Sequence, residues 1–426
     1  MSDQRNLLVG FDLSDDYTQI SCYNIKYYEA ESVSVKDEEK YLIPTVLCVK
    51  NDTKDWLFGD EALSVAGKSE GVLINHLVEL GMKDESITIF DINFMASTLL
   101  EKYFRKTLSI LKMKYPANSI RQLVVTVEEV NDNLSKCIYT ALEALGIGKD
   151  RVVVKSHAVA SMYYTLNQNK ELWMNDVGIF HYNGTKLIFY HIGINRRTKP
   201  CAVTVTKEDF TSSFGELYTS AATSTKEHKS QLAYLFHRIA KTSLSKNVIS
   251  TVFITGKGFE EDWIDATLQD LCLGRRIFKG MNLYTKGACY MARELSGDKK
   301  FEEYILLSEE MLHSNVWMSA YVDAKIQDVV LAHIGTPWYE IQDEIEFIFD
   351  GKSEVIIHSK SIFERDTKTY KLILDNLPTR PNKMTRACLS IRCKDKEYLE
   401  AELKDLGFGE LYPGTGITCT SLIPLV

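Results

Sequence analysis

The first third of the chain shows short apolar and β-branched runs separated by polar turns. Runs at 7–11 and 19–23 flank one such turn and predict a β-hairpin, and the run at 41–49 predicts a further strand. Between 93 and 113, apolar residues return every three to four positions, which predicts a helix with one buried stripe. Strands and helices therefore alternate from the start of the chain.

This alternation continues through the next stretch. The pattern predicts a strand at 122–127, a helix at 134–145 that stops at Gly146, a strand at 152–154 and a helix at 158–166. Glycine is the residue that most easily adopts the left-handed conformation that ends a helix. Successive strands and helices of this kind predict a sheet with helices packed against it.

The same order of elements starts again near residue 177. Runs at 177–182 and 186–192 flank Asn183-Gly184, a dipeptide that predicts a two-residue hairpin turn. Further strands and helices are predicted at 202–206, 231–240, 252–255 and 260–271, the last entered through Gly256-Lys257-Gly258. The sequence therefore predicts two similar halves, each opening with a hairpin.

The pattern changes from about residue 304. Strand-like runs follow one another with little helical period between them, at 305–307, 329–333, 345–349, 354–358, 370–374, 387–393 and 398–403. A block of this size and pattern predicts an all-β sandwich. The polar stretch 296–300 is the expected joint, so we expect one domain at 1–300 and a second at 301–426.

Composition and charge narrow the class of protein. The 426 residues are 45% apolar and 25% charged, as in ordinary globular proteins. A formal net charge of −8 argues against nucleic acid as a partner, because binding a phosphate backbone needs a basic surface. No long apolar run and no signal peptide is visible, so we expect a cytoplasmic protein that does not cross a membrane. The nine cysteines include no C-x-x-C pair, and we interpret them as reduced interior residues.

Several short segments carry a resemblance to a known superfamily. Residues 9–13 are similar to its first phosphate strand and 43–46 to the strand that follows, while 253–258 resemble its adenosine loop and 286–289 the helix of small residues after that loop. The chain thus resembles the superfamily of actin, sugar kinases and heat-shock chaperone ATPases, and most closely the seventy-kilodalton heat-shock chaperones. The resemblance implies an α/β, actin-like, two-lobed ATPase fold with duplicated ribonuclease H-like halves.

The β-rich end strengthens the resemblance. Residues 305–307 look like the interdomain linker strand of these chaperones, 374–381 like a loop of their peptide-binding domain, and 403–407 like that domain's last strand. The resemblance therefore implies a C-terminal β-sandwich that binds a polypeptide partner. The chain reaches Val426 without the helical lid of such chaperones, so we expect any bound peptide to exchange quickly.

The resemblance also implies a cleft that holds ATP or ADP with Mg²⁺. Phosphate loops of this fold work because small and hydroxyl-bearing residues let backbone N–H groups and a metal ion approach the phosphates. The positions that match those loops are Gly10, Asp12, Ser14, Asp15, Gly184, Thr185, Gly256, Lys257 and Gly258. Gly256 and Gly258 have the strongest claim, because a strand, a glycine turn and a helix can present an anion-binding helix N-terminus.

Other positions depart from the superfamily's pattern. Ser14-Asp15-Asp16 stands where the family has a glycine and hydroxyl residues, and two carboxylates there would repel a polyphosphate. In the second hairpin, His181-Tyr182-Asn183 replaces an acidic residue and part of a glycine run. The glutamate that positions the attacking water corresponds to Ser156, which cannot act as a carboxylate base, and the expected lysine corresponds to Leu63. We therefore expect little or no ATP hydrolysis, no catalytic residue and no protein metal site.

Each of these residues also has a simpler interpretation. Asp12 fits a strand-end turn as well as a ligand-facing position. Asp15 and Asp16 are better explained as solvated turn residues than as a metal site. His157 and His181 are expected to be hydrogen-bonded polar residues rather than catalysts, because the sequence places no cysteine or carboxylate beside them.

Three functions remain open. The first, which the departures favour, is a polypeptide-binding or partner-binding scaffold with a degenerate cleft. The second is an active chaperone-like ATPase that uses divergent site residues. The third, a small-molecule kinase of the same superfamily, is the weakest, because kinases of that superfamily carry no trailing β-sandwich and need a cleft aspartate that the sequence does not place.

Overall fold

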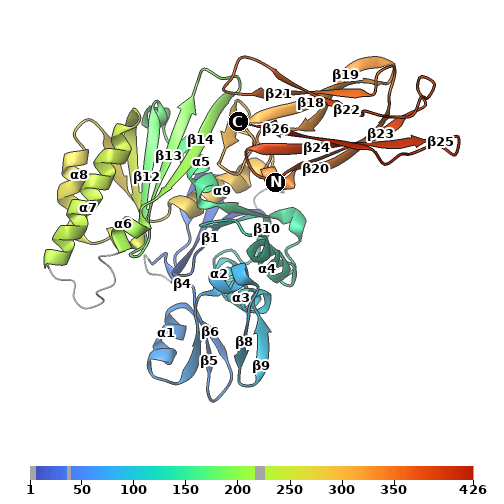
Figure 1. Ribbon diagram of the computed structural model, residues 1–426. Helices are drawn as coiled ribbons and strands as arrows, with labels where there is room; N and C mark the ends of the chain where they lie inside the picture. Colours follow the sequence, from blue (N-terminus) through green and yellow to red (C-terminus); the bar gives the residue numbers. More distant parts are fainter. Residues whose placement is uncertain (1–5, 36–39, 216–225, 426) are drawn as a thin grey trace. The chain divides into compact units, whose positions relative to one another are not determined.

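A computed structural model describes residues 6–35, 40–215 and 226–425 (Figure 1). It combines α-helices with several β-sheets, which confirms the predicted α/β class. The α-helices are α1 (Gly59–Gly67), α2 (Leu77–Lys83), α3 (Ala96–Lys114), α4 (Asp132–Glu143), α5 (His157–Asn167), α6 (Thr211–Gly215), α7 (Lys226–Ser245), α8 (Asp265–Leu271) and α9 (Leu283–Leu295). Within the described residues, no helix is both long and apolar enough to span a membrane.

The chain divides into two compact units. Unit 1 consists of Met1–Ile194 and Val205–Glu302, and unit 2 of Asn195–Thr204 and Glu303–Val426. The segment Asn195–Thr204 was expected in the first domain. It belongs to unit 2 because the start of β14 (Cys201–Asp209) pairs in parallel with β17 (Tyr304–Leu307).

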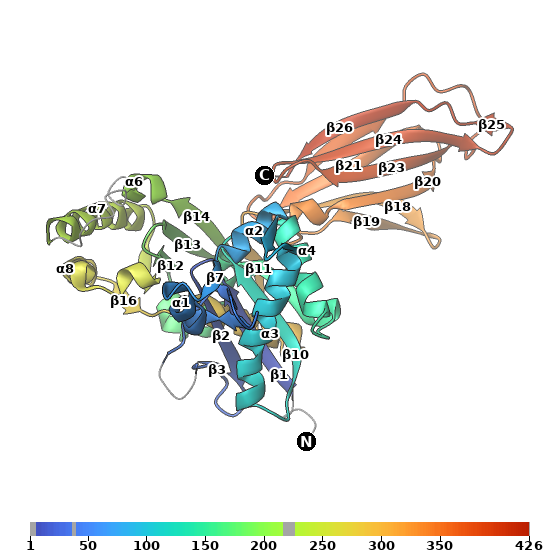
Figure 2. The same ribbon diagram turned by 90° about the horizontal axis from the view of Figure 1, so that it is seen from below.

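The first sheet of unit 1 has the strand order β11-β10-β1-β2-β3, with β4 paired to β2. Its strands are β1 (Asn6–Leu13), β2 (Tyr17–Asn24), β3 (Glu29–Ser32), β4 (Ile43–Pro44), β10 (Ser119–Val127) and β11 (Val152–Ser156). β1 lies between antiparallel β2 and parallel β10. Helices α3 and α4 pack on this sheet through a core that includes Phe11, Phe104 and Ile138 (Figure 2). The central strands are buried on both faces, which explains why they show continuous apolar runs.

A group of short elements follows β4. The strands are β5 (Leu47–Lys50), β6 (Trp56–Phe58), β7 (Gly71–Ile74), β8 (Ser86–Ile89) and β9 (Ile92–Met95), with α1 and α2 between them. The predicted strand at 41–49 is in fact two strands, β4 and β5, interrupted at Thr45 and Val46. Most of the other elements are short and largely exposed, so they contain too few buried positions to show a hydrophobic period.

The second sheet of unit 1 has the order β16-β15-β12-β13-β14. Its other strands are β12 (Asp176–Tyr182), β13 (Leu187–Asn195), β15 (Ile249–Thr255) and β16 (Arg276–Lys279). Helices α7 and α8 lie on one face of it (Figure 1), over a core that includes Phe180, Phe236 and Leu271. The helix predicted at 260–271 begins only with α8, because short 3-10 turns precede it. The 3-10 turns of unit 1 are η2 (Lys149–Arg151), η3 (Lys170–Trp173), η4 (Lys257–Phe259) and η5 (Asp262–Ile264).

The hairpin of β12 and β13 turns one residue later than the sequence predicted. The N–H of Asn183 donates to the carbonyl of Lys186 at 3.3 Å, so Gly184 and Thr185 are the central residues. Gly184 has a φ of 112°, which favours glycine. The side chain of Asn183 stabilises the turn, because its Oδ1 accepts from the N–H groups of Thr185 and Lys186 at 2.9 and 2.8 Å.

Helix α9 makes backbone contacts with both β1 and α5, and glycine permits each of them. A Cβ atom on Gly10 would lie 2.1 Å from the carbonyl oxygen of Thr285 and 2.5 Å from the nitrogen of Cys289. A Cβ atom on Gly287 would lie 2.1 Å from the carbonyl oxygen of Ala160. No larger side chain fits either position without displacing α9, so Gly10 and Gly287 set how closely this helix approaches its neighbours.

Unit 2 is a two-sheet sandwich, as the strand pattern predicted. One sheet has the order β19-β18-β21-β22, and the other the order β20-β23-β24-β25, with β26 paired to β24. The elements are β18 (Ser314–Val322), β19 (Lys325–Ala332), η6 (Trp338–Glu340), β20 (Gln342–Ile348), β21 (Glu354–Ser361), β22 (Lys368–Ile373), β23 (Arg386–Cys393), β24 (Tyr398–Phe408), β25 (Tyr412–Pro413) and β26 (Thr418–Pro424). Val316, Ile357, Leu389 and Leu403 share one core between the sheets. The sequence analysis had missed β18 and β26.

Replacing Gly10 by alanine tests the close packing of α9 on β1. We expect Gly10→Ala to lower the free energy of unfolding by about 1–3 kcal/mol, because the added methyl group collides with backbone atoms that cannot move independently. The measurement is urea denaturation followed by circular dichroism. Gly67→Ala is the matched control, since a Cβ atom there meets nothing within 4 Å. Equal stability of the two variants would contradict the packing argument.

Candidate functional site

The C-terminal ends of β1, β12 and β15 border a small cavity in unit 1. The cavity has a volume of about 60 Å³, and its lining includes Asp12, His181, Thr255 and Tyr284. Pockets that hold small-molecule ligands usually enclose about 300–1,000 Å³. The cavity therefore has room for a few water molecules but not for a nucleotide.

Asp12 is held by two side chains from neighbouring elements. Its Oδ1 lies 2.7 Å from Nε2 of His157 and accepts from Oγ1 of Thr126 at 2.9 Å. The side chains of His157 and Asp12 are only 3% and 12% exposed, respectively. His157 reaches Asp12 because it is the first residue of α5, directly after β11. The sequence by itself placed no carboxylate beside His157, and the structure supplies Asp12 as its partner.

Aromatic rings fill the space next to this pair. The ring of Tyr284 stacks on that of His157 with centroids 3.8 Å apart and planes 3° apart. The ring of His181 lies 5.3 Å from that of Tyr284 and 6.0 Å from that of His157. Burial raises the pKa of Tyr284 well above its usual value, and burial, aided by His157, lowers the pKa of His181 to about 3. Both side chains are therefore neutral at physiological pH.

Several polar atoms around the cavity are buried without a hydrogen-bond partner among the described residues. They are Nδ1 of His157, Nδ1 of His181, Nε2 of Gln19 and the hydroxyl group of Tyr284. Buried polar atoms of this kind are normally satisfied by protein or by ordered water. A polar cavity of this size suits bound water, which would complete their hydrogen bonds.

Polar contacts join the two halves of unit 1 at the mouth of the cavity. Nδ2 of Asn183 donates to Oδ2 of Asp16 at 3.1 Å. The ammonium group of Lys257 contacts the hydroxyl group of Tyr17 and lies 4.3 Å from the centre of its ring. Lys186 forms an ion pair with Glu128 at 2.9 Å. The Asn183–Asp16 contact joins the two hairpins directly, and the other two contacts tie each hairpin to the opposite half of unit 1.

The structure brings together only some of the residues that the sequence analysis proposed for nucleotide binding. Asp12, Ser14, Gly256 and Lys257 line the cavity. Gly184 and Thr185 form the adjacent turn, as described above. Gly10 does not line the cavity, because it faces α9 instead.

The two glycines of the adenosine-loop match have structural roles. Gly256 has a φ of 105°, and a Cβ atom there would lie 2.2 Å from the carbonyl oxygen of Tyr182. A Cβ atom on Gly258 would lie 2.4 Å from the Tyr182 ring and 2.7 Å from the nitrogen of Gly184. Both glycines therefore allow the turn to pack against the second hairpin. The expected helix N-terminus is absent here, because a 3-10 turn of three residues follows Gly256.

Asp15 is not the solvated turn residue that the sequence analysis expected. Its Oδ1 accepts from the N–H groups of Val78 and Glu79 at 2.8 and 3.4 Å, so it caps the start of α2. Burial raises the pKa of Asp15 above its usual value. Asp16, in contrast, is exposed, as expected.

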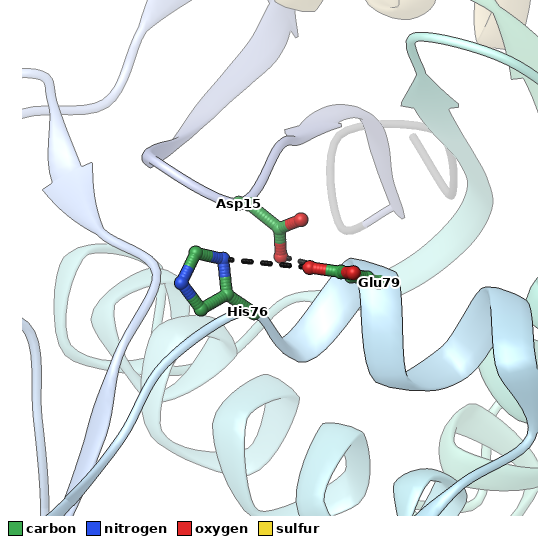
Figure 3. A group of neighbouring side chains, drawn as sticks. All are labelled: Asp15, His76 and Glu79. Atoms are coloured by element: carbon green, nitrogen blue, oxygen red, sulfur yellow. Dashed lines mark hydrogen bonds and ion pairs between the residues drawn. The ribbon is translucent and has the colours of Figure 1, made fainter. Parts of the chain in front are cut away.

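Asp15 also belongs to a group of potential metal ligands that the sequence did not reveal. Ligand atoms of Asp15, His76 and Glu79 lie within 4.8 Å of one another, and the three side chains point toward one another (Figure 3). Glu79 Oε2 lies 3.8 Å from His76 Nδ1, and Oε1 is paired with Lys83 at 2.7 Å. Because the carboxylates already serve the helix cap and this ion pair, we assign the group a structural role.

Sequence reasoning missed Gln19 and Tyr284 as cavity residues and Thr126 as a hydrogen-bond partner of Asp12. No local motif marks them, since each belongs to an otherwise ordinary strand or helix. Tyr284 stands just before the small-residue segment 286–289 that carried part of the resemblance. Its ring meets His157 only because α9 folds back onto α5.

Two family models match most of the chain. Residues 29–309 match the model of a family of unknown function (DUF5716), C-terminal, and residues 311–425 match a domain of unknown function (DUF8552). The first match covers more than half of the chain, so the protein belongs to the DUF5716 family. No curated protein matches the sequence.

The low pKa of His181 predicts a specific dependence of stability on pH. Between about pH 6 and pH 4 the unfolded chain protonates this imidazole, whereas the folded protein does not, so acidification favours unfolding. We expect the stability difference between wild type and His181→Asn to change by up to about 1.4 kcal/mol per pH unit in this range, to the disadvantage of wild type at low pH. Urea denaturation at several pH values measures it.

The control is His333→Asn, which removes an exposed imidazole of unit 2. A constant difference between wild type and His181→Asn from pH 6 to pH 4 would mean that His181 titrates alike in the folded and unfolded chain. That result would contradict the assignment.

Proposed function

We propose that this protein is an actin-like relative of the chaperone ATPases that does not hydrolyse ATP and acts as a polypeptide-binding scaffold. The observation that carries the proposal is the Asp12–His157 pair with Tyr284 stacked on it. The resemblance implies that phosphate and a metal ion would lie at the end of β1. In this structure the hydrogen-bonded Asp12 and His157 side chains and the Tyr284 ring occupy that position.

The charges around the cavity support the absence of hydrolysis. Asp12, Asp16 and Glu128 line it, and among its described lining residues Lys257 is the only lysine or arginine. A triphosphate would meet net repulsion there unless several cations accompanied it. Lys257 is also engaged with Tyr17. Ser156, at the position of the catalytic glutamate, is buried and offers no carboxylate base.

The first test is titration calorimetry of the full chain with ATP and with ADP, each with and without Mg²⁺. We expect no saturable heat up to about 1 mM nucleotide, because ligand binding would have to displace the buried Tyr284 ring. Phosphate release should equal that of buffer. Micromolar binding or turnover by wild type would overturn the proposed inactivity.

A variant makes this test sharper. Tyr284→Ala removes the stacked ring and enlarges the cavity, while Tyr234→Ala removes a tyrosine that is 62% exposed on α7 and serves as the control. If the ring is what blocks the cleft, nucleotide binding should improve in Tyr284→Ala and not in Tyr234→Ala. Circular dichroism checks that both variants fold.

The sandwich of unit 2 supports the polypeptide-binding part of the proposal. Tyr321, Ile326 and Val330 are 75%, 80% and 41% exposed, and the strand register places Tyr321 opposite Ile326 and Trp317 opposite Val330. Val316 and Met318 alternate with Trp317 and Tyr321 on β18 and are buried in the core, so the exposed apolar residues share the outer face of the sheet.

The position of β19 adds a second supporting feature. β19 lies at the end of its sheet, with β18 as its neighbour in the strand order. An extended peptide can pair with such an edge through backbone hydrogen bonds while its side chains contact the apolar face. We therefore propose β19 and the outer face of β18 as the docking surface.

Fluorescence anisotropy with short labelled peptides rich in leucine and valine tests this surface. Ile326→Glu and Val330→Glu are expected to weaken binding at least about tenfold, because each places a charge on the contact face. Thr420→Glu, on an exposed position of β26 in the other sheet, is the control. Equal affinity of all three variants and wild type would exclude β19 as the docking strand.

A further inference from the structure

Unit 1 contains a second and larger pocket at the other end of β1. The pocket has a volume of about 410 Å³, and its lining includes Asn6, Tyr23, Arg121, Arg293 and Asp298. Asn6 begins β1 and Asp12 lies near its end, so the pocket is roughly 20 Å from the Asp12 cavity at the rise of an extended strand. Its volume is in the range of pockets that bind small molecules.

Arg293 is the central charged group of this pocket. Its side chain is only 3% exposed, and the guanidinium carbon lies 5.5, 5.9 and 5.6 Å from the ring centres of Tyr23, Tyr290 and Phe301. Its position on the last turn of α9 brings it there, beyond the closely packed Cys289. A nearly buried guanidinium needs acceptors for its N–H groups.

Within the described part of the chain, the protein supplies acceptors for most of this guanidinium, which also interacts with the Tyr23 side chain, but not for Nε. One terminal nitrogen of Arg293 donates to Oδ1 of Asn167 at 3.0 Å and the other to Oε1 of Glu294 at 2.6 Å. The Nε atom is buried and has no hydrogen-bond partner among the described residues. The nearest carboxylate oxygen in an ion pair with it, Oδ2 of Asp298, is 3.7 Å away, and the Asp298 side chain is 66% exposed.

A β-bulge adds a second guanidinium to the pocket. In the pairing of β1 with β10, Leu7 lies opposite Ile120 but Leu8 lies opposite Gln122, so Arg121 is an extra residue in its strand. Bulges re-aim side chains and are frequent next to functional sites. Arg121 lines the pocket and donates to the carbonyl oxygen of Ser296 at 2.9 Å.

The charged groups and the aromatic side chains that line the pocket indicate which class of ligand it would bind. Two arginines and one exposed aspartate line it, and Glu294, outside the lining, pairs with Arg293 at 2.6 Å. Tyr23, Ile25 and Tyr28 also line it and offer aromatic and aliphatic surface beside the guanidinium groups. Arginine is the side chain best suited to carboxylate and phosphate oxygens, because its donors form a planar fork.

We propose that this pocket binds a small organic oxyanion, a carboxylate or a phosphate monoester, whose charged group meets Arg293 and Arg121 and whose flat or apolar body lies against Tyr23 and Tyr28. The inference is independent of the Asp12 cavity and of the docking surface on β19. A nucleotide-free cleft and a functional oxyanion pocket can therefore coexist.

Titration calorimetry of the full chain with phenyl phosphate and with benzoate tests the proposal, with sodium chloride at matched ionic strength as the blank. Saturable binding of either compound supports it, and the stronger of the two identifies the charged group as phosphate or carboxylate. No saturable heat from either compound up to about 10 mM would overturn the proposal.

Variants at the pocket rim locate the binding without disturbing the buried Arg293. Arg121→Gln should weaken binding roughly tenfold, because it removes a charge-assisted contact. Asp298→Asn should tighten binding about threefold, because it removes the carboxylate that competes for Nε of Arg293. Arg105→Gln, at an exposed arginine of α3 outside the pocket, is the control and should bind like wild type. Unchanged affinity in both Arg121→Gln and Asp298→Asn would place the binding elsewhere and refute the proposed site.

Discussion

The close approach of α9 to β1 and α5 is the constraint on which the rest of unit 1 depends. Glycine at positions 10 and 287 removes the side chains that would hold the helix away. The helix is 13 residues long, so its two ends lie roughly 20 Å apart. Its first turn carries Tyr284 into the Asp12 cavity. Its last turn carries Arg293 into the pocket at the start of β1, here called the distal pocket. One packing contact thus positions both sites.

The Asp12 cavity combines features that favour structure over catalysis. A histidine and a threonine already use the carboxylate oxygen that would otherwise face a ligand. The neutral rings of Tyr284 and His181 then occupy the adjacent volume. The side chains around this cavity connect the two halves of unit 1. The polar contacts at its mouth, such as Asn183 with Asp16, add to this connection.

Unit 2 has a different balance of polar and apolar surface on its two sheets. The outer face of one sheet is covered by charged pairs such as Arg386 with Glu346 and Arg392 with Glu400. The outer face of the other also carries an ion pair, Lys371 with Glu354, but its β18–β19 half exposes tyrosine, isoleucine and valine next to an edge strand. Charged side chains protect a sheet from association, whereas an apolar face beside an open edge favours it. This exposed apolar patch beside an open edge is the reason that we propose β19 as the docking strand.

Local pattern was enough to predict the α/β class, most of the larger strands and helices of unit 1, and the β-sandwich of unit 2. It succeeded because strands and helices bury residues at periods that neighbouring positions already reveal. It failed for the short exposed elements after β4, which bury too little to show a period. It also misplaced the turn at Gly184 by one residue, where the Asn183 side chain accepts from the N–H groups of Thr185 and Lys186.

The chemistry of both sites was decided only by the tertiary structure. His157 reaches Asp12 across 145 positions of the chain, and Tyr284 reaches His157 from another helix. The sequence suggested that Asp15 is a solvated turn residue. In the structure it caps α2, because that helix packs next to it. The bulge that adds Arg121 to the distal pocket exists only in the pairing of β1 with β10. Burial and hydrogen bonding between distant residues create these properties, and no local spacing encodes them.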